Sequence, residues 1–99
     1  AFQVPEDAVP VITLDHNYEI LLPQTAWEFT KLTPRIPAEG FVQGAYLQYG
    51  SGRIVVFGEA AMFTAQQSGK NKFGMNAKTA SQNMQFLLNT IHWLDGLID

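Results

Sequence analysis

The spacing of apolar residues predicts short β-strands at the front of the chain. Residues 11–14 and 18–22 are runs rich in β-branched and aromatic side chains, and residues 15–17 between them read Asp-His-Asn. Aspartate and asparagine bond to neighbouring backbone groups in turns. We therefore predict a hairpin formed by these two runs. Pro23 should end its second strand, because proline has no N–H group to offer a neighbouring strand.

The stretch that follows has no clear periodicity. Residues 24–40 contain two prolines and end in a glycine, so we interpret them as an irregular connection over the surface. Residues 26–29 fit a single helical turn. Trp27 and Phe29 are the large apolar side chains of this stretch, and we expect them to anchor it.

A second hairpin is predicted from the runs 41–49 and 53–57. The Gly-Ser-Gly sequence at 50–52 joins them, and glycine supplies the positive φ that a tight hairpin turn needs. The second run is apolar at four consecutive positions, residues 54–57. A strand that is buried on one face only would alternate, so we expect this strand to be central and covered on both faces. It would then belong to a larger sheet than these residues supply.

The last third of the chain reads as a polar loop followed by an amphipathic helix. Residues 66–78 hold two glycines and three lysines, which favours an exposed loop. A helix is predicted over residues 79–95, with Thr79 or Ser81 capping its start and Gly96 ending it. Its apolar stripe consists of Met84, Leu87, Leu88, Ile91, Leu94 and Ile98, with Phe86 and Trp93 on one flank.

Composition restricts the possible functions. The 99 residues allow one domain at most, and an apolar fraction of 46% argues against disorder. A net charge of −3 with six scattered basic residues argues against nucleic-acid binding, which needs clustered Lys and Arg. No apolar run approaches the ~20 residues of a membrane span, so we expect no membrane insertion. The chain begins with Ala1, from which we expect processing or a boundary inside a longer protein.

Side chains for metal, disulfide or thiol chemistry are scarce. The chain has no cysteine, so it has no disulfide, no thiolate zinc ligand and no cysteine nucleophile of its own. Its two histidines, His16 and His92, have no further His or Cys at ligand spacing, whereas metal sites usually need three or four converging ligands. We expect no metal and no cofactor.

Short motifs in the second half of the chain carry a family resemblance. They are residues 43–45, 49–53, 56–63, 65–66, 74–76, 83 and 85–96, joined by residues 21–23 and 26–29 upstream. On these motifs the chain resembles the C-terminal part of the class I glutamine amidotransferase-like fold, and within it a group of bacterial proteins without an assigned activity. The resemblance implies an α/β fold in which residues 1–99 are an incomplete, closing segment of a layered sheet domain: β-hairpins and one C-terminal amphipathic helix. The parallel strands would come from an N-terminal half.

The chain departs from that family at the catalytic residues. True amidotransferases of this fold use a cysteine nucleophile, with a histidine and a glutamate after a late strand. Here Gly58 stands near the expected histidine, Glu59 follows it, and no cysteine is present. We therefore expect a domain that binds a ligand or a partner, and leave open whether it is an enzyme. The alternatives are a cell-envelope hydrolase completed by the missing half, and a structural module that self-associates.

Partners and location follow from the same resemblance. The expected partner is the chain's own N-terminal half or a second copy in a homo-oligomer, and the resemblance suggests an exported or periplasmic protein. The candidate ligand-binding residues are Gly58, Glu59, Gln66 and Asn76, because ligands bind beyond the carboxyl ends of strands in α/β sheets. The alternatives are that Glu59 caps the following turn and that Asn76 organises its own loop.

Overall fold

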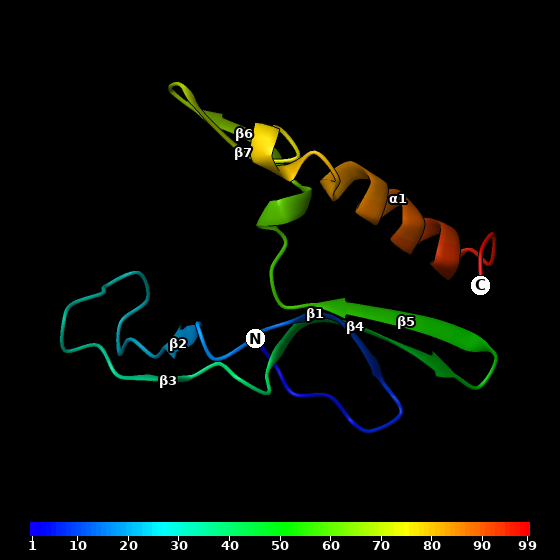
Figure 1. Ribbon diagram of the computed structural model, residues 1–99, viewed down its shortest axis with the longest axis horizontal. Helices are drawn as coiled ribbons and strands as arrows, with labels where there is room; N and C mark the ends of the chain where they lie inside the picture. Colours follow the sequence, from blue (N-terminus) through cyan, green and yellow to red (C-terminus); the bar gives the residue numbers. More distant parts are fainter.

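A three-stranded antiparallel sheet forms the centre of the molecule, as shown by a computed structural model of residues 1–99 (Figure 1). Its strands are β1 (Val9–Thr13), β4 (Val42–Tyr49) and β5 (Gly52–Phe57), in the order β1-β4-β5. The predicted β4–β5 hairpin is confirmed, with Tyr49 opposite Gly52 and a φ of +59° at Gly50 in the turn. The molecule is mixed α/β, with small antiparallel sheets and one C-terminal helix.

The predicted hairpin between residues 11–14 and 18–22 is wrong. β1 pairs with β4, whereas β2 (Glu19–Leu21) pairs with β3 (Arg35–Pro37) in a separate two-stranded sheet. The predicted turn does form, because the Asn17 N–H donates to Asp15 Oδ1 at 2.8 Å. Strand β4 offers β1 a longer and more deeply buried neighbour than β2 does, since β4 includes Val42 and Ala45, two of the few buried residues.

Residues 24–40 do not hold the anchors that we expected. The side chain of Trp27 is 90% exposed and that of Phe29 is 52% exposed. The helical turn is replaced by a turn in which Trp27 has a φ of +69°. The buried residues of this stretch are instead Thr33 and Ala38, whose small side chains fit beside the narrow β2–β3 ribbon.

The polar stretch 66–78 forms a hairpin rather than a loop. It consists of β6 (Ala65–Ser68) and β7 (Asn71–Gly74), and it follows a short 3-10 turn, η1 (Ala61–Phe63). The expected exposure is confirmed, because every residue of the hairpin except Gly74 is exposed. The hairpin projects away from the central sheet (Figure 1).

The C-terminal helix α1 (Asn83–Leu94) is shorter than the predicted 79–95. A separate 3-10 turn, η2 (Lys78–Ala80), precedes it. The predicted caps Thr79 and Ser81 are wrong, because Gln82 is the N-cap and no side chain caps the helix. The predicted end is confirmed, since the Gly96 N–H donates to a carbonyl of the last helical turn.

The helix is rotated away from the orientation that its apolar stripe predicts. Phe86 and Trp93, which we placed on a flank, face the sheet: Phe86 lies 5.7 Å from the Phe57 ring and Trp93 lies 4.9 Å from the Tyr46 ring. Large aromatic rings bury more area than aliphatic side chains, which favours this orientation. Much of the predicted core stripe is therefore exposed, namely Met84 (59%), Leu88 (41%), Ile91 (49%) and Leu94 (44%).

Strand β5 is not the central, doubly covered strand that we predicted. It lies at the edge of the sheet, and its side chains alternate between half-buried and exposed. Arg53, Val55 and Phe57 lie on the half-buried face, whereas Ile54 and Val56 are 43% and 49% exposed on the other. Strand β4 is the central strand instead.

The molecule exposes more surface than a chain of its mass usually does. Its accessible surface is 7776 Å², whereas a compact 11.0 kDa protein has about 5,600 Å². Its radius of gyration is 16.0 Å, against about 13 Å for a compact chain of this length. Only five of the 99 residues are buried. The surplus of about 2,200 Å² is surface that a compact fold would have removed from water.

Candidate functional site

Glu59, the main candidate from the sequence, lies two residues after the end of β5, and its side chain accepts hydrogen bonds from its own turn. Its Oε1 atom accepts hydrogen bonds from the backbone N–H groups of Ala60 and Ala61, both at 2.8 Å. These two donors enter η1, so the carboxylate holds the start of that turn. This is the capping role that the sequence left as the alternative to ligand binding.

Gln66 and Asn76 meet each other but not Glu59. The Asn76 side-chain amide donates to the backbone oxygen of Gln66 at 3.2 Å, and no hydrogen bond joins either residue to Glu59. The contact ties the chain after β7 back onto β6. It corresponds to the expected alternative in which asparagine organises its own loop.

Position 58 has no room for a side chain, because the side chain of Gln43 occupies the space where a Cβ atom would lie. A Cβ atom at Gly58 would lie 2.5 Å from Gln43 Oε1, so the glycine does not leave room for a ligand. The Gly58 N–H also donates to the Gln43 backbone oxygen at 2.9 Å. Gln43 Oε1 is buried and has no hydrogen-bond partner. No role for Gln43 was predicted from the sequence, although Gln43 belongs to a motif of the resemblance.

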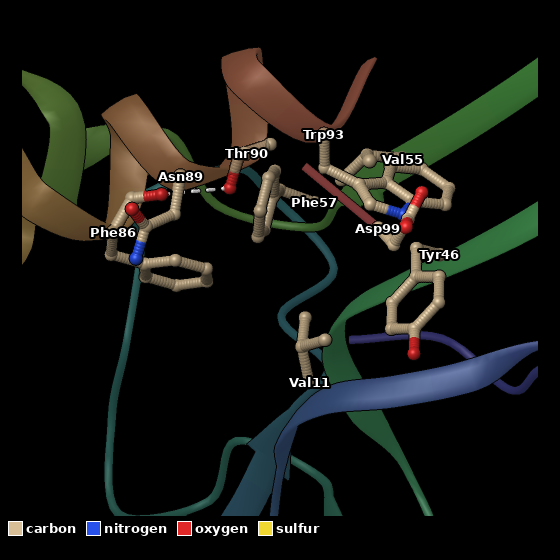
Figure 2. Close-up of a pocket in the computed structure, with 9 residues that line it drawn as sticks. All are labelled: Val11, Tyr46, Val55, Phe57, Phe86, Asn89, Thr90, Trp93 and Asp99. Carbon is tan, nitrogen blue, oxygen red and sulfur yellow. Dashed lines mark hydrogen bonds between the residues drawn. The ribbon is translucent and has the colours of Figure 1, made fainter. Parts of the chain in front are cut away.

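A cavity of about 240 Å³ lies between α1 and the central sheet (Figure 2). Its strand side carries Val11, Tyr46, Val55 and Phe57, and its helix side carries Phe86 and Trp93. Sequence reasoning missed this site, because it treated the aromatic residues as ordinary core. The signal was present in the aromatic residues at 86 and 93, which share one face of the helix.

The polar groups of the cavity are few and partly engaged. The Thr90 hydroxyl donates to the Phe86 carbonyl at 2.9 Å, and Asn89 Oδ1 accepts from Gln85 at 2.7 Å. Asp99 lines the opening and is fully exposed. A cavity with this lining suits an apolar, planar molecule better than a charged one.

Arg53 fastens the end of α1 to β5. Its Nη1 donates to the carbonyl oxygens of Trp93 at 2.5 Å and Ile98 at 2.9 Å, and its guanidinium carbon lies 5.0 Å from the centre of the Trp93 ring. Cations are favourable beside the carbonyl end of a helix. The positive charge of Arg53 therefore interacts with groups of the chain itself, at the end of α1.

Other kinds of site find no counterpart in the structure. No three His, Asp or Glu side chains lie together in a way that could hold a metal ion. The one α-helix is too short and too polar to cross a membrane.

In comparisons with protein-family models, with curated proteins and with solved structures, nothing matches this chain.

Proposed function

We propose that this chain is a protein-binding domain: a closing segment of an amidotransferase-like fold that lacks the cysteine and histidine of that family and works through binding. The surplus accessible surface of about 2,200 Å² carries this proposal. A standard protein–protein interface covers about 800 Å² on each partner, and obligate interfaces cover more. The surplus is therefore in the range that a stable partner covers.

The outer face of α1 supports a polypeptide partner. Met84, Leu88 and Ile91 follow the i, i+4, i+7 spacing of one helix face, and each is at least 41% exposed. Contiguous apolar side chains on a helix surface mark interaction sites, whereas single exposed apolar residues carry little meaning. A partner that covers this face would remove these side chains from water.

The geometry gives less support to a hydrolase built on Glu59. One carboxylate oxygen of Glu59, Oε1, already accepts two backbone hydrogen bonds, which hold the side chain against its own turn. Glu59 is also exposed on the surface and is not among the residues that line the cavity between α1 and the sheet.

The outer face of α1 can be tested with charge substitutions. Leu88→Lys and Ile91→Lys should leave the melting temperature of the isolated chain nearly unchanged, because both side chains are already half exposed. They should reduce binding of the apolar dye ANS and any association seen by light scattering. Gln85→Lys, on the polar side of the helix, is the matched control. A wild-type chain that is monomeric and binds no ANS would contradict the proposal.

The aromatic cavity supports a second candidate, the binding of a small apolar molecule. Calorimetric titration with toluene would test it, because toluene is planar, uncharged and small enough for about 240 Å³. Val55→Trp should fill the space and abolish the heat of binding. If the wild-type protein gives no heat that this variant removes, the cavity is only loosely packed.

A further inference from the structure

The two edges of the central sheet differ in how well they are protected. Edge strand β1 carries Pro10, and its register with β4 shifts on both sides of Ile12. Proline and irregular register are devices that prevent another strand from pairing with an edge. Edge strand β5 contains no proline, and its register with β4 is regular from Phe57 to Gly52. The sheet is closed to addition on the β1 side and open on the β5 side.

The backbone of β5 presents a free row of donors and acceptors. The Gly58 N–H donates to Gln43 on β4, and backbone groups alternate sides along a strand. The backbone N–H and C=O groups of Arg53, Val55 and Phe57 therefore point toward the free edge. None of these groups forms a hydrogen bond within the chain. A charged side chain at the edge would discourage pairing, but the only charge on β5, Arg53, is turned toward the end of α1.

The apolar flank of α1 overhangs the same edge. The side of α1 that carries Asn89 lines the cavity together with Val11 on β1, so it faces the β1 side of the sheet (Figure 2). At 100° per residue, Leu87 and Leu94 lie on the opposite side of the helix. Both side chains therefore lie toward the free edge of β5. A strand added there would bury them from below.

Helix spacing argues against a second copy of β5 as the added strand. Neighbouring strands lie about 4.8 Å apart, whereas packed helices need 8–10 Å between their axes. Among the strands, α1 packs chiefly on β5. A copy that paired through its own β5 would bring its own α1 into collision with this one.

We propose that the free edge of β5 accepts one further strand from another polypeptide, an extended and uncharged run rich in valine and isoleucine. It is apolar on both faces, because one face packs under Leu87 and Leu94 and the other lies beside Ile54 and Val56. This inference rests on the proposed protein-binding function and names the element through which the partner attaches. Main-chain hydrogen bonds supply the affinity of such strand addition, and the apolar side chains supply its specificity.

Amide hydrogen exchange of the 99-residue chain tests the proposal. The probe is an acetylated and amidated peptide of alternating valine and isoleucine with lysine at each end. The amides of Val55 and Phe57 should exchange rapidly in the dilute chain and become at least tenfold slower with the peptide. The amides of Ile54 and Val56 face β4 and should not change, which makes them internal controls. A peptide methylated at its backbone nitrogens should give no protection.

Two variants separate strand addition from general apolar binding. Val55→Pro removes an outward N–H and should abolish the protection, while its circular dichroism stays that of the wild type, because proline is tolerated on an outward-facing edge. Leu94→Glu places a charge under the overhang and should weaken peptide binding at least tenfold. Gln85→Glu, on the polar side of α1, should leave peptide binding unchanged.

Three results would overturn the inference. Equal protection by the methylated peptide would show that backbone pairing is not involved. Protection of Val55 that rises with chain concentration in the absence of peptide would make a second copy the occupant. Absence of any peptide effect, in a chain that still binds ANS at the outer face of α1, would leave the protein-binding function standing and place the partner away from β5.

Discussion

Replacing Arg53 by methionine gives a direct test of how the helix is held to the sheet. Methionine keeps an apolar stem of similar length but removes the guanidinium group. The variant therefore deletes the hydrogen bonds to the carbonyl oxygens of Trp93 and Ile98 and the contact with the Trp93 ring. The packing of the rest of β5 stays as it is.

The expected loss follows from the surroundings of the guanidinium. A hydrogen bond from a charged donor contributes about 1.5–3 kcal/mol, and a partly exposed cation–π contact adds about 0.5–1 kcal/mol. The side chain of Arg53 is 21% exposed, so the two hydrogen bonds count for less than their full values. The ion pair with Asp99 adds nothing, because that carboxylate is fully exposed at 3.8 Å. We expect Arg53→Met to lower the free energy of unfolding by about 2–3 kcal/mol.

Arg35→Met is the matched control. Arg35 forms a single ion pair with Glu19 at 3.0 Å, and the two side chains are 48% and 53% exposed. Such a pair contributes about 0.5 kcal/mol. Urea unfolding followed by tryptophan fluorescence measures both variants. The melting temperature should fall by about 8–24 °C for Arg53→Met and by no more than about 4 °C for Arg35→Met. Equal losses would refute the assignment of Arg53 as the fastener of α1.

Three further substitutions test other parts of the structure. Gly74→Ala should lower the free energy of unfolding by about 3 kcal/mol, because Gly74 has a φ of +64° and a Cβ atom there would collide with the Thr64 carbonyl oxygen. Gly69→Ala is the control: Gly69 has a φ of +61° but open space around it, so the loss should be about 1 kcal/mol. Urea unfolding of both variants measures the difference. Glu59→Gln keeps an acceptor for its turn and should change stability by under about 0.5 kcal/mol, whereas Glu59→Ala should cost about 1 kcal/mol; equal melting temperatures for the two would remove the capping role. Trp27→Gly should not lower the melting temperature, because Trp27 is 90% exposed at a φ of +69°, and a clear drop would show that this side chain is an anchor after all.

The fold was predictable from the sequence wherever neighbouring residues decide it. The turn between β4 and β5 forms where glycine at position 50 permits a positive φ, and Asp15 bonds to the backbone of Asn17. Helix α1 ends before Gly96 as predicted. Each of these features depends on residues a few positions apart, so the local sequence is enough to specify it.

The candidate site was less predictable, because its residues are far apart along the chain. The position of Glu59 after a strand was correct, but only the folded turn shows that its Oε1 atom is engaged by two backbone donors. The packing of Gly58 against Gln43 joins two strands. The aromatic cavity brings together β1, β4, β5 and α1, and no local pattern indicates which rings meet there.

The sequence by itself therefore determined the turns, the β4–β5 hairpin and the existence of an amphipathic C-terminal helix, because short-range backbone preferences specify these elements. Only the tertiary structure decided that β1 pairs with β4, that β5 is an open edge and that α1 turns Phe86 and Trp93 rather than Leu88 and Ile91 toward the sheet. Those outcomes depend on which distant surfaces are available to be buried. A helix with apolar residues around more than half of its circumference can pack only one face against the sheet. Here that face carries the largest side chains, the aromatic rings, because they bury the most area.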